Sequence, residues 1–284
     1  MRPLKMPVAD PVLVFKLCVS GLKQDTEKVT FMTVEPLIGQ AGARYSAFAL
    51  QKELHLLQRQ TTIGGTVTIE EIKNLYSSAF SSRSGVARRV YDDIVNTAPN
   101  RICPLCGIGT VSSLDHHLPQ SKYPEYVLIP ANLVPSCFDC NKAKFTKFPK
   151  TAEQQTIHPY FDDYTQETWL YAQVVEVSPP ALMFYVRAPN HWAMVDQERV
   201  KWHFDVFKLG RLFTSNAGNE LGEMRSHLVK GLAGNEAAIK LHLKEQAETC
   251  RDAHVNSWRT AMYEALSNNE WFLGDGFREI PSPQ

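Results

Sequence analysis

The spacing of hydrophobic residues predicts a mostly helical N-terminal third. Apolar residues recur at helical intervals over residues 45–57 and again over residues 84–96. Between these stretches, residues 68–71 read Thr-Ile-Glu-Glu, the pattern of a capping box, which marks the start of a helix. The earlier residues 12–35 hold short apolar runs of strand length, and we interpret them as strands.

A different pattern begins after the middle of the chain. Residues 171–188 alternate between apolar and polar around a pair of prolines at 179–180, which predicts the two strands of a β-hairpin. From about residue 195 to residue 268 the spacing is helical again. Within that stretch, Gly218 and residues 231–235 predict breaks between three helices. The chain as a whole therefore has the pattern of an α+β protein.

Charge is distributed unevenly along a 284-residue chain whose net charge is zero. Residues 80–150 carry nine Lys and Arg against five Asp and Glu, whereas residues 151–284 carry twelve against eighteen. A basic middle suits a polyanion such as nucleic acid. Arg88 and Arg89, on the outward face of the helix expected over residues 84–96, are candidate contacts to it. The acidic C-terminal part better suits a scaffold or a surface for a partner protein.

The chain shows no signal for a membrane. Its most apolar early run, residues 11–21, is too short to span a bilayer and is interrupted by Lys16. Asp10 and Lys16 also disagree with the pattern of a signal peptide. We therefore expect a cytoplasmic protein with no membrane partner. In a reducing compartment, paired cysteines indicate a metal rather than a disulfide.

Four of the six cysteines form two Cys-x-x-Cys pairs, at Cys103 and Cys106 and at Cys137 and Cys140. Four thiolates complete a tetrahedral zinc site with no open position, so the predicted zinc is structural. Thirty residues lie between the pairs, more than the roughly 15–20 that a simple zinc ribbon needs. A further segment, which contains Asp115, His116, His117, Pro119 and Asn132, is therefore inserted between the two halves of the zinc site.

The run CPLCG…LDHHLP…NLVPSCFDCNKAK, within residues 103–144, resembles the HNH endonucleases of the ββα-metal, or His-Me finger, type. That family has a cysteine pair, then Asp-His-x-x-Pro, then Asn-Leu, then a second cysteine pair followed directly by His or Asn. The resemblance implies two strands and a helix around a catalytic metal, and hydrolysis of phosphodiester bonds in DNA, with RNA also possible. Small HNH proteins with extra domains are often restriction or phage-defence nucleases.

The same resemblance separates two neighbouring histidines. In this family the catalytic histidine lies three residues before the proline, here Pro119, and directly follows an acid. His116 therefore corresponds to the general base and Asp115 to that acid, while His117 falls where relatives have an apolar residue. A neutral imidazole is a suitable base near pH 7. The alternative is that either histidine is a surface or packing residue.

Two asparagines complete the implied catalytic set of Asp115, His116, Asn132 and Asn141. Asn132 corresponds to the residue that ties the loop between the strands to backbone and so orients the histidine; the alternative is a plain turn residue. Asp115 and Asn141 offer oxygen ligands, which select hard cations, so the implied catalytic ion is Mg²⁺ or Mn²⁺. This ion would occupy a site separate from the zinc.

Lysines follow the second cysteine pair, on the expected helix of the finger. Asn141 and Lys144 are three residues apart and so share a helix face. We expect Lys142, Lys144 and Lys147 to contact nucleic acid backbone, and Phe145 and Phe148 to pack inward. A solvated helix face is the alternative. Residues 158–163 are interpreted as a turn that seats the next element, rather than a segment that brings His158 to the site.

These inferences predict an α+β fold: a mainly helical body around a central zinc-stabilised ββα-metal finger, with a small β-hairpin after it. The expected regions are 1–99, mostly helical; 100–150, the HNH core with its zinc knuckles; and 151–284, the hairpin plus acidic helices. The expected function is metal-dependent cleavage of DNA, and the alternative is a non-catalytic zinc module that binds nucleic acid or a protein. A regulatory partner such as an ATPase, and an oligomer, are compatible with the sequence.

Overall fold

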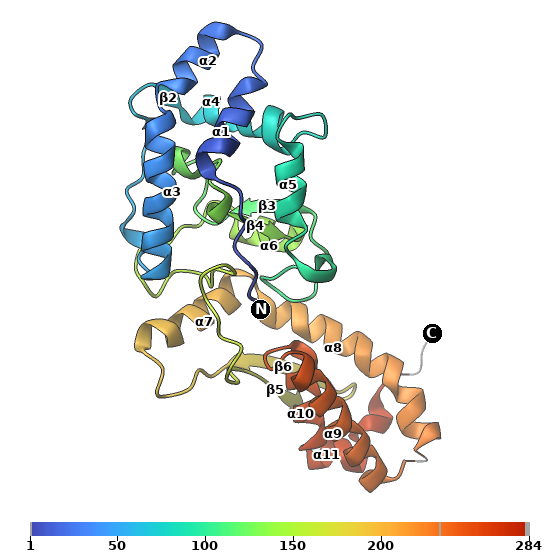
Figure 1. The fold of residues 1–284 in the computed structure, drawn as a ribbon. Helices are drawn as coiled ribbons and strands as arrows, with labels where there is room; N and C mark the ends of the chain where they lie inside the picture. Colours follow the sequence, from blue (N-terminus) through green and yellow to red (C-terminus); the bar gives the residue numbers. More distant parts are fainter. Residues whose placement is uncertain (1, 233, 282–284) are drawn as a thin grey trace. The chain divides into compact units, whose positions relative to one another are not determined.

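The structure, a computed structural model, describes residues 2–232 and 234–281. Two compact units make up the chain, Arg2–Asp163 and Tyr164–Gln284 (Figure 1). The regions expected over residues 1–99 and 100–150 thus lie in one unit, which continues to Asp163. Its α-helices before the cysteine pairs are α1 (Pro11–Ser20), α2 (Asp25–Met32), α3 (Glu35–Leu50), α4 (Ile69–Leu75) and α5 (Arg88–Val95).

The expectation of strands over residues 12–35 is wrong, because this stretch forms α1 and α2. Asp10 caps α1 by accepting a hydrogen bond from the Leu13 N–H at 2.9 Å, and a proline occupies the first turn. The apolar residues Phe15 and Val19, four positions apart, lie on the buried side of the helix. The cap and this spacing are the signals that distinguish the helix from a strand.

Short elements connect these helices. They are the 3₁₀ turns η1 (Leu54–Leu56) and η3 (Pro99–Arg101), the π-helix η2 (Tyr76–Ser81), and the paired strands β1 (Thr62–Ile63) and β2 (Val67–Thr68). The predicted capping box is confirmed at the start of α4. The Thr68 N–H donates to the Glu71 carboxylate at 2.8 Å, and the Glu71 N–H donates to the Thr68 hydroxyl at 3.3 Å.

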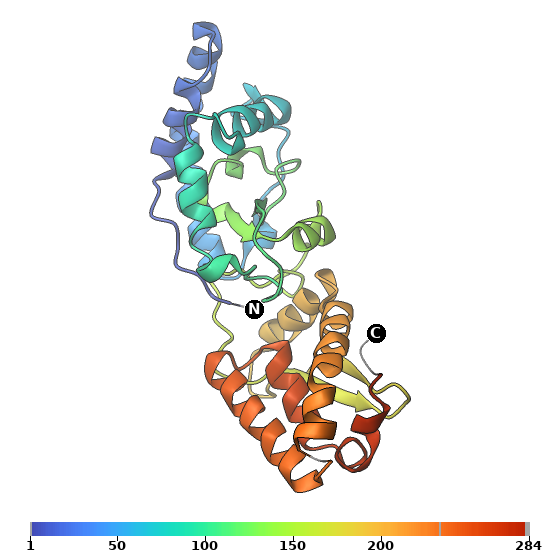
Figure 2. The same ribbon diagram turned by 90° about the vertical axis from the view of Figure 1, so that its right-hand side faces the viewer.

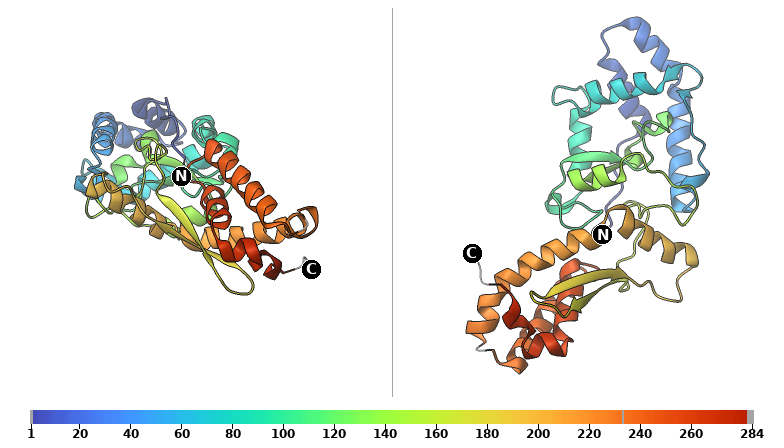
Figure 3. Two further views of the ribbon diagram at one scale, coloured as in Figure 1. Left: turned by 90° about the horizontal axis from the view of Figure 1, so that it is seen from below. Right: turned by 180° about the vertical axis from the view of Figure 1, so that it is seen from behind.

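Two antiparallel strands and a helix follow. Strand β3 (Ser113–His116) pairs with β4 (Leu133–Ser136), with His116 opposite Leu133, and α6 (Phe138–Lys144) begins directly after β4. Figure 3 shows this ββα unit from behind, with α6 beside the two strands. The connection between the strands contains η4 (Pro124–Tyr126) and η5 (Pro130–Asn132) and is largely buried against α3.

The second unit begins with the predicted hairpin, which is confirmed as β5 (Leu170–Val175) antiparallel to β6 (Ala181–Val186). In this unit α10 (Trp258–Ser267) packs on β5 and α8 (Leu209–Ser226) on β6 (Figure 2). Its helical elements are α7 (Met194–Val206), α8 (Leu209–Ser226), η6 (His227–Gly231), α9 (Glu236–Ala253), α10 (Trp258–Ser267), α11 (Glu270–Gly274) and η7 (Gly276–Glu279).

One of the two predicted helix breaks is correct. The helices separate after Gly231, and the Asn235 side chain caps α9 by accepting from the Ala238 N–H at 3.0 Å. The break expected at Gly218 is wrong, because α8 continues through it. A glycine inside a helix costs only about 1 kcal/mol, and burial of Ala217 and Leu221 on the same helix outweighs that cost.

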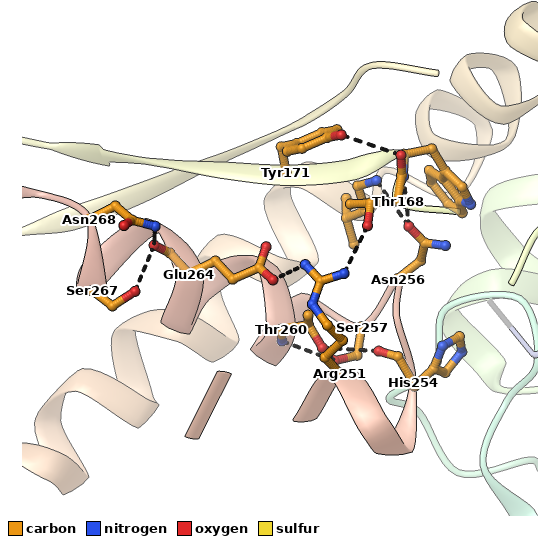
Figure 4. Close-up of polar contacts among 12 residues, drawn as sticks. Thr168, Tyr171, Arg251, His254, Asn256, Ser257, Thr260, Glu264, Ser267 and Asn268 are labelled. Carbon is orange, nitrogen blue, oxygen red and sulfur yellow. Dashed lines mark hydrogen bonds and ion pairs between the residues drawn. The ribbon is translucent and has the colours of Figure 1, made fainter. Parts of the chain in front are cut away.

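A buried amide joins the hairpin to the helices of the second unit (Figure 4). The Asn256 side-chain oxygen accepts hydrogen bonds from the Trp169 and Leu170 N–H groups at 2.8 and 3.2 Å. Its amide nitrogen donates to the carbonyls of Tyr164 and Glu167 at 3.0 and 2.9 Å. Asn256 thereby satisfies four backbone groups at the entry to β5, which fixes where the hairpin begins.

The described residues form an α+β fold, mainly helical, with three antiparallel sheets of two strands each. Among residues 2–232 and 234–281, no helix combines the length and the hydrophobicity needed to cross a bilayer.

Candidate functional site

The four paired cysteines come together in the first unit. The sulfur atoms of Cys103, Cys106, Cys137 and Cys140 all lie within 4.8 Å of one another, and all four side chains are buried. A tetrahedral zinc with Zn–S bonds of about 2.3 Å needs sulfurs about 3.8 Å apart. The Cys106 and Cys137 sulfurs are 3.9 Å apart. The cluster therefore has the donors and the spacing to hold a zinc ion.

Two glycines shape the first cysteine pair. Gly107 has a φ of +73°, a conformation that L side chains rarely adopt, and its N–H donates to the Cys103 carbonyl at 2.8 Å. The Gly109 N–H donates to the Cys106 sulfur at 3.3 Å. A Cβ at Gly109 would lie 2.7 Å from the Cys137 sulfur, so the second cysteine pair closes over a position that only glycine can occupy.

The cluster is joined to both strands of the ββα unit. Cys137 is the N-cap residue of α6 and directly follows β4. On the other side, the Ser112 N–H donates to the Ser136 carbonyl at 3.0 Å, just before β3 begins. An ion held by the four sulfurs would therefore fix the junction of β4 with α6 relative to the segment that leads into β3.

His116 is buried on β3, with 7% of its surface exposed. Its Nε2 lies 3.0 Å from the Val127 carbonyl oxygen. A carbonyl can only accept, so we assign the proton to Nε2, and the lone pair of the neutral ring is then on Nδ1. Burial lowers the pKa of His116 to about 4, although the hydrogen bond to Val127 opposes this. The ring is therefore neutral at pH 7.

Asn132 braces the connection between the strands. Its side-chain oxygen accepts from the Leu118 N–H at 2.7 Å, and its amide nitrogen donates to the carbonyls of Leu118 and Tyr126 at 3.1 and 3.0 Å. Its own carbonyl accepts from the His117 N–H at 2.8 Å. These bonds fix the chain on both sides of the connection. One of them holds Tyr126, the residue directly before Val127, whose carbonyl bonds to His116.

Asp115 and Lys144 form a buried ion pair between β3 and α6. The Lys144 ammonium lies 3.0 Å from one Asp115 carboxylate oxygen and donates to the His116 carbonyl at 2.6 Å. Burial raises the pKa of the Asp115 carboxyl, and the charge of Lys144 opposes that shift. Lys144 is only 3% exposed. In this conformation its ammonium is bonded within the ββα unit and is not presented to a phosphate outside it.

Asn141 lies beside this pair on α6, half-buried. Its amide nitrogen donates to the Ser113 hydroxyl at 3.0 Å, which leaves the amide oxygen as the acceptor. Ser113 and Asp115 are two residues apart on β3 and so share a face of the strand. The structure thus brings Asp115 and Asn141, the two residues expected to bind Mg²⁺ or Mn²⁺, to facing surfaces of β3 and α6.

The two histidines occupy different environments. His117 is buried with its ring centroid 4.2 Å from that of His158, whose Nε2 lies 3.0 Å from the Tyr45 hydroxyl. Residues 158–163 form a turn, as expected, in which the Asp162 carboxylate accepts from the His158 N–H at 2.7 Å. His117 and His158 therefore belong to an aromatic cluster with Tyr45.

The candidate phosphate contacts differ in how available they are. Arg88 is paired with Asp92 at 2.9 Å and lies over the Tyr91 ring, whereas Arg89 is exposed. Lys142 and Lys147 are also exposed. The expectation that Phe145 packs inward is wrong: it is 74% exposed, at a φ of +49°, because α6 ends there and the chain turns outward. Phe148 is half-buried.

Fold and site together define an α+β protein in which a buried four-cysteine cluster, able to hold zinc, adjoins a ββα unit. The chain is 30% identical over 296 residues to Protein ea31 of Escherichia phage lambda, and this covers 96% of the chain and 99% of the phage protein. The chain therefore belongs to the same family as that protein. Its sequence matches no model of a known protein family, and no solved structure matches it.

Proposed function

We propose that this protein is a metal-dependent endonuclease of the HNH type that hydrolyses phosphodiester bonds in DNA, with RNA as the alternative substrate. One observation carries the proposal: His116 is held in a single orientation and kept neutral. The Val127 carbonyl fixes Nε2, and the Asn132 side chain fixes the loop that supplies this carbonyl. A packing histidine has no need of a dedicated brace on the loop that it contacts.

His116 is the proposed general base, acting through Nδ1. Its role is to accept a proton from the attacking water, and a base must be unprotonated to do so. The lowered pKa meets that condition at neutral pH. The Val127 carbonyl sets the orientation of the ring and keeps Nε2 protonated, so that Nδ1 is always the basic nitrogen.

Asp115 and Asn141 are the proposed ligands of a catalytic Mg²⁺ or Mn²⁺. A carboxylate and an amide oxygen suit a hard cation, and the two side chains lie on facing elements. Bound there, the ion would stabilise negative charge on the phosphate and on the leaving oxygen. The Lys144 ammonium lies beside Asp115 and competes with the ion for this carboxylate, so metal binding would require Lys144 to shift.

The four-cysteine site is proposed to hold a structural zinc. Four sulfur ligands leave no open position for a substrate or a water molecule. Its proposed task is to hold α6 against β3, and with it the pair Asn141 and Asp115.

A second candidate function is a non-catalytic zinc module that binds nucleic acid or a protein. The burial of the site favours it: Asp115 and His116 are 6% and 7% exposed, and Asp115 already has a cationic partner in Lys144. Such a module would use the ββα unit as a rigid support, and its exposed lysines would make the contacts.

Cleavage of supercoiled plasmid, and of a labelled RNA in parallel, separates the two candidates. With Mg²⁺ or Mn²⁺ we expect nicking or linearisation, and with EDTA none. His116→Ala should lose roughly 10²–10⁴ in rate, the usual contribution of a general base. His117→Ala is the matched control and should retain most of the activity at equal zinc content. An inactive His117 variant beside an active His116 variant would place the base one residue later.

We also propose that the acidic helices of the second unit bind a regulatory protein, such as an ATPase, or a second copy of the chain, as part of a restriction or phage-defence system. The support is the excess of Asp and Glu over Lys and Arg in Tyr164–Gln284, fifteen against twelve. Reversing exposed acids on α8 and α9, such as Glu223 and Glu248, should leave nucleic acid binding unchanged and alter the sedimentation of the protein or its complex. Reduced DNA binding in these variants would count against this assignment.

A further inference from the structure

The first unit contains an open basic hollow outside the ββα unit. It has a volume of about 680 Å³, and its lining includes His55, Leu57, Arg59, Tyr123, Phe148 and Lys150. No acidic residue lines it. A hollow of this size can take a small organic group. We call this site the Phe148 hollow.

Its charges and its aromatic ring occur together. The Phe148 side chain is half-buried, and the Arg59 guanidinium and the Lys122 ammonium lie over its ring, 5.2 and 5.1 Å from the centroid, so a base that stacks on this ring takes the place of one of these cations. None of the ion pairs within residues 2–232 and 234–281 involves Arg59, Lys122 or Lys150. In the described part of the chain these three cations therefore have no acidic partner, whereas His55, which also lines the hollow, interacts with Glu153. An anion that carries a flat ring would complement both features.

The walls of the hollow are fixed to one another. The Gln60 N–H donates to the Lys122 carbonyl at 3.1 Å, which joins the segment of Arg59 to that of Tyr123. The Tyr123 ring packs edge-on against Phe148 with centroids 6.2 Å apart. The hollow is thus built from three segments of the chain in a defined arrangement, and is not a loose cluster of surface lysines.

The hollow also adjoins the candidate catalytic unit along the chain. Tyr123 lies in the connection between β3 and β4, four residues before Val127, whose carbonyl holds His116. Its ring packs on Tyr126, with centroids 6.2 Å apart, and the Tyr126 carbonyl accepts from Asn132. On the other side, Phe148 follows the end of α6 by four residues. A strand held in the hollow would therefore run close to the ββα unit.

We propose that the Phe148 hollow binds one unpaired nucleotide of a nucleic acid strand, with its base against the Phe148 ring and its phosphate between Arg59 and Lys150. In a duplex both faces of each base are covered by stacking, whereas an unpaired base can stack on an aromatic side chain. The nucleic acid recognised by this protein thus contains a single-stranded segment beside the bond to be cut. This proposal rests on the proposed function only for the cleavage step; the binding itself is independent of it.

The test measures binding by fluorescence anisotropy, without added divalent metal, to a labelled oligo(dT) strand and to a duplex of equal length. Phe148→Leu keeps the lining apolar and should weaken single-strand binding by about 5- to 150-fold, the effect of losing one base stack. Duplex binding should not change. Phe148→Tyr restores the ring and should restore the affinity. Arg59→Gln and Lys150→Gln should each weaken binding, and the double variant, which loses both cations around that phosphate, should reduce the salt slope by about 0.7.

Arg187→Gln is the matched control. Arg187 also lies over an aromatic ring, that of Tyr171 at 4.5 Å, but in the second unit, and its variant should bind like wild type. Zinc content and melting temperature are compared for every variant. The proposal is overturned if the wild type does not bind the single strand, or if Phe148→Leu binds it as tightly as the wild type does. An equal loss of duplex binding in Phe148→Leu also overturns the proposal. Displacement of the strand by equimolar thymidine monophosphate does so as well, because it would identify a free nucleotide as the ligand.

The two proposals fail in different ways. If no variant cuts plasmid or RNA but single-strand binding depends on Phe148, the hollow stands and the nuclease assignment falls. If cleavage depends on His116 while Phe148→Leu binds normally, only the hollow is wrong.

Discussion

At the scale of single residues, two neighbouring histidines illustrate how surroundings decide chemistry. His116 has one ring nitrogen bonded to the Val127 carbonyl, and its ring meets that of Tyr76 edge-on at 4.7 Å. The His117 ring instead packs against that of His158. The two histidines differ by one position in sequence, yet their rings lie among different side chains, and burial moves the pKa of His116 far from its ordinary value.

The lowered pKa of His116 predicts an acid-sensitive fold. The folded ring takes up a proton only near pH 4, whereas the unfolded ring does so at about 6.5. Its contribution to stability is therefore complete above pH 6.5 and is lost as the pH falls toward 4. Between pH 7 and pH 4.5 the wild type should lose about 2–3 kcal/mol more free energy of unfolding than His116→Asn. Urea unfolding of both proteins at the two pH values measures this difference.

Comparing the wild type with His116→Asn cancels the other effects of acid on stability, because protonation of the cysteines and of the remaining histidines is common to both proteins. Equal losses in wild type and His116→Asn would mean that His116 is accessible to solvent and titrates normally.

At the scale of elements, the turn after the first cysteine pair offers a clean prediction about zinc. Gly109→Ala places a Cβ 2.7 Å from the Cys137 sulfur and 2.8 Å from its Cβ, so the second pair must move away. We expect zinc affinity to fall by at least about 10-fold, as for other changes that misplace metal ligands. Competition with a chromophoric chelator gives the affinity.

Gly107→Asn serves as the control for that substitution. A Cβ there meets nothing within 4 Å, and asparagine tolerates the left-handed conformation better than other residues. It should retain most of the zinc affinity. If the Gly107 variant loses zinc and the Gly109 variant keeps it, backbone conformation rather than space governs the site.

At the scale of the whole molecule, the two units should respond differently to zinc removal. If the four cysteines hold zinc, the binding free energy is part of the folding free energy of the unit Arg2–Asp163. Chelation should then raise hydrogen exchange in that unit, with the largest change over residues 103–144. All five tryptophans lie in Tyr164–Gln284, so their emission should remain that of the folded protein.

Elemental analysis should find about one zinc per chain, and Cys103→Ser should reproduce the effect of chelation. A well-folded preparation without zinc would refute the metal site. A tryptophan emission that shifts together with zinc loss would show instead that the two units unfold as one.

The sequence alone determined those features whose signals lie within a few residues. Two equal cysteine spacings indicate a four-sulfur site, Thr68 and Glu71 indicate a capped helix, and alternation around two prolines indicates a hairpin. Each depends on local geometry, such as a turn that brings i and i+3 together, and so can be read before the fold is known.

Tertiary structure decided what depends on neighbours that are distant in sequence. Lys144 has the same local pattern as Lys142 and Lys147, but only Lys144 meets a carboxylate 29 residues away and is buried with it. Phe145 and Phe148 look alike in sequence, yet the end of α6 turns the first outward, and the second meets Arg59 from a segment far earlier in the chain. Burial and ion pairing require a partner to be brought into place, and that partner is set by the packing of the whole unit, not by any short stretch of sequence.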